Sequence, residues 1–130
     1  MDSAKIDELL QNAPYDPQAG IRLVRVGGDS CTAVFAAQID PRVALKAHYH
    51  ESGDELYFIL EGEGVMHTAA RSGENAGLRV SFPVTGGDVF TVPEGCVHSL
   101  ENRSCAMLRA LFVCAPEHVS TDRFFTEDQL

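Results

Sequence analysis

The sequence lacks the features of several large protein classes. It contains no tryptophan and only 10 basic residues against 19 acidic ones, which gives 130 residues a formal net charge of −9. Because nucleic acids and anionic lipids are bound by basic surfaces, this charge argues against both kinds of partner. No apolar run approaches the about 20 residues needed to cross a bilayer, and the acidic start MDSAKIDELLQ does not resemble a signal peptide. We therefore expect a cytoplasmic protein with no membrane or nucleic-acid partner.

Closely spaced cysteine pairs are also missing. The chain is long enough to bury a core without disulfide bonds, and its cysteines show no C-x-x-C spacing. We predict reduced, mostly buried thiols at Cys31, Cys96, Cys105 and Cys114.

Helical periodicity is nearly confined to residues 3–11, where Ile6, Leu9 and Leu10 share one face. The rest of the chain consists of short apolar runs separated by turn residues, a pattern typical of an all-β sandwich or barrel. The polar tail from Pro116 is expected to lie on the surface or to pack loosely. We predict strands at residues 21–26, 32–39, 43–50, 55–60, 64–68, 78–82, 88–92, 98–101 and 106–114.

The stretch HYHESGDELYFILEG, which begins at His48, has candidate metal ligands. Strand alternation places His48 and His50 on the same face. Residues 51–54 indicate a tight turn that folds residues 55–60 back as an antiparallel partner, with Glu55 beside His50. Two imidazoles and a carboxylate suit zinc, iron, manganese or nickel. The alternative is an exposed strand that carries two histidines and no metal.

The stretch GGDVFTVPEGCVHSLEN contains a further candidate ligand. A strand at 88–92 leads into a turn at 93–95, and His98 then opens the returning strand. His98 therefore lies at a strand end beside a tight turn, as a ligand would. The other two histidines, His67 in mid-strand and His118 in the tail, are interpreted as ordinary polar residues.

Together the two stretches resemble the paired motifs of the cupin superfamily, in particular its small, single-domain conserved-barrel members. The first motif is matched by His48, His50, Glu55 and Gly62, and the second by Gly87, Pro93, Gly95, His98 and Asn102. One departure is Arg42, which stands where the first family motif usually begins with glycine. It puts the backbone leading into that strand in doubt.

The resemblance implies one cupin domain over residues 1–130, with a barrel core at about 21–115 and metal motifs at 48–62 and 87–102. Its fold would be an all-β double-stranded β-helix, or jelly roll, with a short N-terminal helix. One divalent transition metal (Fe, Mn, Ni or Zn) would be held by His48, His50, Glu55 and His98. Gly95 would permit the turn that aims His98 inward, and Asn102 would fix a turn.

Three functions are compatible with such a site. The first is a metal-dependent enzyme, of the dioxygenase or isomerase type, that acts on a small oxygenated molecule. The second is a non-catalytic small-molecule-binding or sensing protein that uses the same metal, and the third is a purely structural metal. Tyr57 and Lys46 are candidate catalytic residues, because alternation places Tyr57 on the face of Glu55 and Lys46 on that of His48. We also expect a homodimer that protects exposed sheet edges, with the strand at 21–26 and the preceding helix as candidate contacts.

Overall fold

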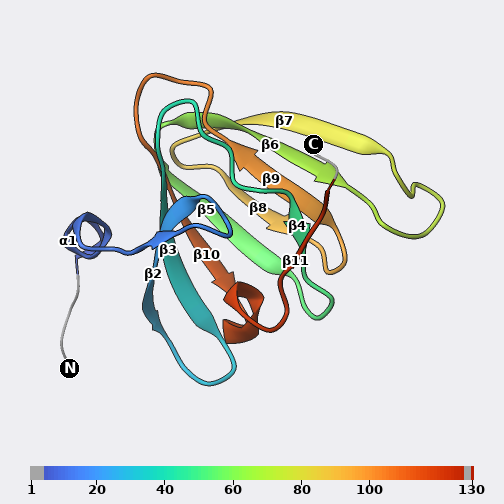
Figure 1. Cartoon of the computed structure of the whole chain (residues 1–130), viewed down its shortest axis with the longest axis horizontal. Helices are drawn as coiled ribbons and strands as arrows, with labels where there is room; N and C mark the ends of the chain where they lie inside the picture. The colour runs from blue at the N-terminus through green and yellow to red at the C-terminus, as the bar shows by residue number, and fades with distance from the viewer. Residues whose placement is uncertain (1–4, 128–129) are drawn as a thin grey trace.

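The computed structural model describes residues 5–127 and 130, which form two antiparallel β-sheets packed face to face (Figure 1). The first sheet contains, in spatial order, β1 (Tyr15–Asp16), β2 (Ile21–Gly28), β3 (Ala33–Ile39), β10 (Leu108–Cys114), β5 (Glu55–Glu61) and β8 (Val89–Val92). The second contains β11 (Phe124–Phe125), β4 (His48–Tyr49), β9 (Val97–Glu101), β6 (Glu63–Ala69) and β7 (Arg79–Thr85). The helices are α1 (Ile6–Gln11) and the short 3₁₀-helix η1 (Pro116–Val119). This nearly all-β jelly roll confirms the predicted fold class.

Alternation along the strands places apolar side chains between the sheets. In β5, Glu55, Tyr57 and Ile59 are buried while the residues between them are partly exposed. The prediction that Tyr57 and Ile59 share the inward face of Glu55 is therefore confirmed. Met66 and Leu100 of the second sheet join Tyr57 and Ile59 in one core cluster, so both sheets contribute to the same interior.

The predicted strand at residues 43–50 is wrong for most of its length, because only β4 is a strand there. Arg42 has a φ of 66° and is the sole non-glycine residue with positive φ in the described part of the chain. Strict alternation also fails, since the neighbours Ala47 and His48 are both buried. Lys46 is exposed, so the expectation that it shares the inward face of His48 is wrong. Alternation predicts a face only where a segment pairs as regular strand, and residues 43–47 make only one isolated bridge, from Ala44.

The predicted hairpin at the first histidine motif is wrong as well. β4 pairs with β9 and β11, whereas β5 pairs with β10 and β8 in the other sheet. The turns at 51–54 and 93–95 therefore carry the chain from one sheet to the other instead of joining neighbouring strands. Turn residues indicate a reversal of the chain but do not determine which strands pair afterwards.

The C-terminal segment is held against the barrel, which corrects the expectation of a loosely packed surface tail. η1 buries His118, and β11 pairs with β4. Figure 1 shows this segment leaving β10 and running up to β4. The last turns of the chain therefore lie beside the first histidine motif.

The N-terminal helix packs on the outer side of the first sheet. Leu10 of α1 is buried with Ala13 and Ala36, in a small cluster separate from the main core. Residue 3, where the predicted helix begins, lies outside the described residues, and the described helix begins at Ile6. Neither described helix has the length and apolar character needed to span a bilayer.

The cysteines are all free thiols, as predicted, but they are less buried than expected. Cys31 and Cys105 are exposed, Cys96 is half-buried and only Cys114 is fully buried. The expectation of mostly buried thiols is thus wrong.

Candidate metal centre

The structure brings His48, His50, Glu55 and His98 together between the two sheets. His48 in β4 and His98 in β9 are register partners on neighbouring strands. His50 follows β4 directly, while Glu55 begins β5 in the opposite sheet. The cross-sheet turn at 51–54 thus delivers the carboxylate from one sheet to histidines of the other.

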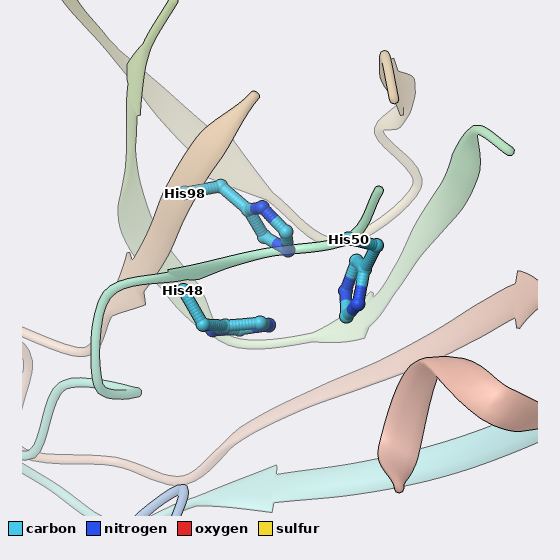
Figure 2. A group of neighbouring side chains, drawn as sticks. All are labelled: His48, His50 and His98. Atoms are coloured by element: carbon cyan, nitrogen blue, oxygen red, sulfur yellow. The ribbon is translucent and has the colours of Figure 1, made fainter. Parts of the chain in front are cut away.

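The three histidine rings converge on one small region (Figure 2). The ring centroids of His48 and His98 are 4.2 Å apart, and those of His50 and His98 are 5.2 Å apart. Each of the three rings offers a nitrogen, and these nitrogens lie within 4.8 Å of one another. All three side chains are buried, with His98 at 0% exposure. This spacing allows the three imidazoles to bind one ion.

Backbone carbonyls fix the orientation of each ring. Nδ1 of His48 lies 2.7 Å from Lys46 O, Nδ1 of His98 lies 3.0 Å from Cys96 O, and Nδ1 of His50 lies 2.6 Å from Asp122 O. A carbonyl oxygen only accepts hydrogen bonds, so each Nδ1 carries the proton and donates it. The Nε2 of each neutral ring is therefore left as a free lone pair, which is the arrangement that metal-binding histidines adopt.

Two of these lone pairs are buried without a partner. Nε2 of His50 and Nε2 of His98 make no hydrogen bond within the described residues. Nε2 of His50 nevertheless lies 3.0 Å from Glu55 Oε2, and Nε2 of His98 lies 4.0 Å from Glu55 Oε1. Buried acceptors that face a carboxylate are costly unless a cation lies between them. The donor set therefore fits a divalent metal ion, and because it contains no thiolate it is unlike most structural zinc sites.

The protonation behaviour of the site agrees with this donor set. Burial, reinforced by the nearby His98, holds the pKa of His48 well below its ordinary value. Burial also lowers the pKa of His98, although the Glu55 carboxylate opposes the shift. For Glu55 burial alone would raise the pKa, but the contacts with His118 and His50 outweigh burial and lower it. His48 and His98 are thus favoured in the neutral form and Glu55 in the ionised form, the forms in which these groups bind metals.

His118 is part of this cluster, which sequence reasoning missed. Its side chain is 1% exposed, and Nδ1 lies 2.9 Å from Glu55 Oε2. The ring stacks on His50 with centroids 4.0 Å apart and an interplanar angle of 6°. The sequence holds only a weak signal for this position. Cys114 faces the interior at the end of β10, and Pro116 begins a turn only two residues later.

The two candidate catalytic residues lie in different surroundings. Lys46 is exposed, and its ammonium is 3.4 Å from Pro17 O, away from the clustered side chains. Tyr57 is completely buried, and its hydroxyl has no hydrogen-bond partner within the described residues. Its ring lies edge-on to His98, with centroids 6.0 Å apart. Burial and the nearby Glu55 carboxylate raise the pKa of Tyr57 well above its usual value, so the phenol stays protonated.

A cavity of about 20 Å³ lies next to the clustered side chains. Its polar wall includes His48, His50, Glu55 and His118, together with Arg123. The rest of the wall is apolar, with Ala19, Ile21, Leu23, Leu45, Phe112 and Val119. A cavity this small holds about one water-sized group, so a larger ligand requires movement of the wall.

Gly95 and Asn102, which were expected to shape turns beside the site, both do so in the structure. Gly95 has a φ of 75°, and its N–H donates to His50 O at 2.7 Å, so the turn is tied to the first motif. Asn102 is fully buried and donates from Nδ2 to Ile39 O and Ala106 O. Both residues therefore fix the backbone around the site, as predicted.

Sequence comparisons relate the chain to known proteins. The cupin domain family matches the chain over residues 36–114. An oxalate-binding protein from Thermotoga maritima is 33% identical over 76 residues, which is 58% of this chain and 55% of the relative. Cupincin from Oryza sativa is 33% identical over 103 residues, which is 78% of this chain but 20% of that protein. The chain thus spans about half and a fifth of the lengths of these two relatives.

A solved structure shows the same fold over nearly the whole chain. A Klebsiella pneumoniae protein with a double-stranded β-helix domain has a TM-score of 0.75 at 18% identity. The similarity covers 98% of this chain and 99% of that protein. At this identity, the similarity shows that the two chains share a fold.

Proposed function

The chain belongs to the cupin domain family, and on this premise we propose that it is a metal-dependent enzyme acting on a small oxygenated molecule. The proposed reaction type is that of a dioxygenase or an isomerase. The proposed ligands are His48, His50, Glu55 and His98, which would hold one Fe, Mn, Ni or Zn ion. The observation that carries the proposal is the convergence of imidazole lone pairs, two of them buried without a partner, beside a carboxylate.

A bound divalent metal would supply Lewis acidity to an oxygen-containing ligand. The chain's own residues support such chemistry in three ways. Backbone carbonyls hold the imidazoles in the tautomer with a free Nε2. The small cavity with its partly apolar wall leaves room for little water, which strengthens electrostatic interactions inside it. The guanidinium of Arg123 in the same wall is paired with Asp16 Oδ2 at 2.7 Å and has further N–H donors for a polar ligand.

A non-catalytic role is the second candidate, and one observation favours it. The described wall of the cavity offers little beyond His118 that could transfer protons to a ligand, and the Arg123 guanidinium is already paired with Asp16. The Thermotoga maritima relative is named for oxalate binding. This chain would then hold a small carboxylate on the metal without converting it.

The two candidates are separated by one series of measurements. Protein purified without chelator is analysed for Fe, Mn, Ni and Zn, and oxalate is titrated into the metal-loaded protein by calorimetry. A screen of small oxygenated molecules then follows oxygen consumption and product formation. Turnover by the metal-loaded protein supports the enzyme, and saturable binding without turnover supports the binding role. Failure to bind any of the four metals contradicts both.

We further propose that the protein is a homodimer. β7 ends the second sheet, and Val80 on this strand is 51% exposed, beside Leu78 at 56%. Unpaired strand edges with apolar side chains favour pairing with another chain. α1 packs on its own sheet, so we now favour this edge over the predicted N-terminal contact. Light scattering coupled to size exclusion gives the mass, and a 14.1 kDa species at micromolar concentration contradicts the proposal.

A further inference from the structure

His118 differs from the other clustered histidines in how its two nitrogens are used. Nδ1 lies 2.9 Å from Glu55 Oε2, and Nε2 lies 2.7 Å from Ser52 O. Both partners are acceptors, a carboxylate and a backbone carbonyl. Both nitrogens of His118 therefore face protein acceptors, and Nδ1, one of the atoms that could hold an ion together with His50 and Glu55, is engaged by the Glu55 carboxylate.

The position of His118 also limits what it can do. Its side chain is fully buried, and its ring stacks on His50. A metal could approach Nδ1 only by replacing the hydrogen bond to Glu55. Geometry thus favours contact with the ligand Glu55 over direct contact with the metal.

The same short segment contacts the first motif at a second point. Both carboxylate oxygens of Asp122 accept backbone hydrogen bonds, from Glu51 N at 2.7 Å and from Ser52 N at 3.0 Å. The carbonyl of Asp122 accepts the Nδ1 proton of His50 at 2.6 Å. The segment from His118 to Asp122 therefore holds two of the proposed ligands, although it contributes none itself.

We infer that His118 is a positioning residue for the metal centre, which orients the Glu55 carboxylate through the hydrogen bond from Nδ1. This inference rests on the proposed metal site and adds a residue outside the two family motifs. A carboxylate held at one oxygen keeps its orientation toward the imidazoles before the ion arrives. Hydrogen-bonded partners of this kind typically contribute about 10–100-fold in metal affinity.

Two substitutions separate the contacts of His118. The amide nitrogen of asparagine lies near the place of imidazole Nδ1, so His118→Asn preserves the donor to Glu55. The amide nitrogen of glutamine lies near the place of Nε2, so His118→Gln preserves the donor to Ser52 and loses the one to Glu55. Both variants remove the ring, so a general loss of packing affects both.

The control is the same pair of substitutions at His67. That side chain is 9% exposed and also uses both nitrogens, toward Ser81 and Glu101, but it lies outside the cluster. His67→Asn and His67→Gln therefore report what the loss of a buried, hydrogen-bonded histidine does to metal binding through the fold alone. Melting temperatures of all four variants are measured in the same buffer.

The experiment titrates Mn(II) and Co(II) into the metal-free full chain and records the visible spectrum of the Co(II) form. We expect His118→Gln to bind both ions about 10–100-fold more weakly, with a shifted spectrum. We expect His118→Asn to stay within about threefold of the unsubstituted chain, since the positioning bond survives. Both His67 variants should bind as the unsubstituted chain does.

Each other result overturns the inference in a recognisable way. Equal loss in His118→Asn and His118→Gln shows that the ring itself matters, as a ligand or as packing. Unchanged affinity in both His118 variants shows a purely structural role, and equal loss in the His67 variants shows an effect on folding. If the unsubstituted chain binds neither of these ions nor Fe, Ni or Zn, the proposed function fails together with the inference, whereas the preceding outcomes leave the metal site standing.

Discussion

The two sides of the second sheet use histidine in opposite ways. On the inner side, His48 and His98 donate hydrogen bonds from Nδ1 to backbone carbonyls, and the Nε2 of each ring is left as an acceptor. On the outer side, His67 has Ser81 Oγ 2.7 Å from Nδ1 and Glu101 Oε1 2.8 Å from Nε2. Both nitrogens of the outer ring have hydrogen-bond partners in the protein. The Nε2 atoms of the inner rings are acceptors that lie close to one another. Burial alone does not separate them, because His67 is also buried.

The difference teaches that unsatisfied lone pairs, rather than buried histidines, mark the metal centre. The Glu101 carboxylate beside His67 also contacts Arg103, and the hydrogen bond from His67 lowers the pKa of Glu101. That cluster balances its own charge. The inner cluster has one carboxylate facing several imidazoles and leaves Nε2 atoms without protein partners. Only the inner cluster therefore holds unpartnered imidazole nitrogens that an added cation would satisfy.

The largest effect is expected from substitution of a proposed ligand on the inner side, compared with substitution of His67 on the outer side. His48→Ala should lower metal affinity by more than the about 10–100-fold that loss of an orienting partner costs, because a coordinating atom is lost. His67→Ala, the control on the outer side, should keep its metal content and lose only folding stability. Elemental analysis and Mn(II) titration check both. A fully loaded His48→Ala protein would contradict the ligand assignment.

The next effect concerns pH in the metal-free protein. Burial depresses the pKa of His48 and His98 in the folded chain. The unfolded chain then binds more protons below its histidine pKa of about 6.5, so the free energy of unfolding falls as pH drops from about 6.5 toward the folded pKa. Above about pH 6.5 this contribution is fully present. Denaturant unfolding at several pH values, with His48→Gln as the control, measures the slope.

Bound metal should steepen this dependence. Saturation at 100 times the dissociation constant stabilises the folded state by about 2.7 kcal/mol, and this increment requires neutral imidazoles. Protons compete for the same nitrogens, so the increment should vanish below about pH 6. Melting temperatures with and without metal from about pH 4.5 to 8 test this. A constant increment across that range would show that histidines are not the dominant ligands.

A smaller effect tests the candidate Tyr57 on the inner side. Its buried hydroxyl lacks a partner, and an unsatisfied buried polar group costs about 1–3 kcal/mol. Tyr57→Phe should therefore raise the free energy of unfolding by about 1 kcal/mol and leave metal affinity unchanged. Urea unfolding and Mn(II) titration measure the two quantities. A decrease in stability would show that the hydroxyl has a favourable partner, and a selective loss of turnover would support a catalytic role.

The smallest effect is expected at Arg42, where the backbone leads toward the site and a substitution should change stability without changing metal affinity. Arg42 has a φ of 66°, a conformation that costs non-glycine residues about 1–2 kcal/mol. Arg42→Gly should raise the free energy of unfolding by less than about 1 kcal/mol, because glycine is also more flexible when unfolded. Metal affinity should not change. Arg42→Ala, which keeps the strain but removes the contact with Cys105, is the control, and equal stability of both variants would contradict the strain.

The fold class could be predicted from the sequence, because short apolar runs separated by turn residues are a local pattern that can be seen along the chain. Strand β10 and the face of β5 followed from alternation over a few residues. Where the pattern failed, at residues 43–47, the chain makes one isolated bridge instead of a regular ladder. The sheet to which each strand belongs was not available from local signals, so the hairpin at the first motif was predicted wrongly.

The sequence predicted four metal ligands through the spacing of the two cupin-like motifs, which is a property of the linear chain. Only the tertiary structure decided that β4 and β5 lie in opposite sheets, and that His118 contacts Glu55 from 63 residues away. It also supplied the carbonyl of Asp122 for His50, over a separation of 72 residues. Such contacts depend on how the two sheets close around a shared interior. The entropy lost in closing such long loops is offset by the packing of the whole fold, so no local pattern in the sequence predicts these contacts.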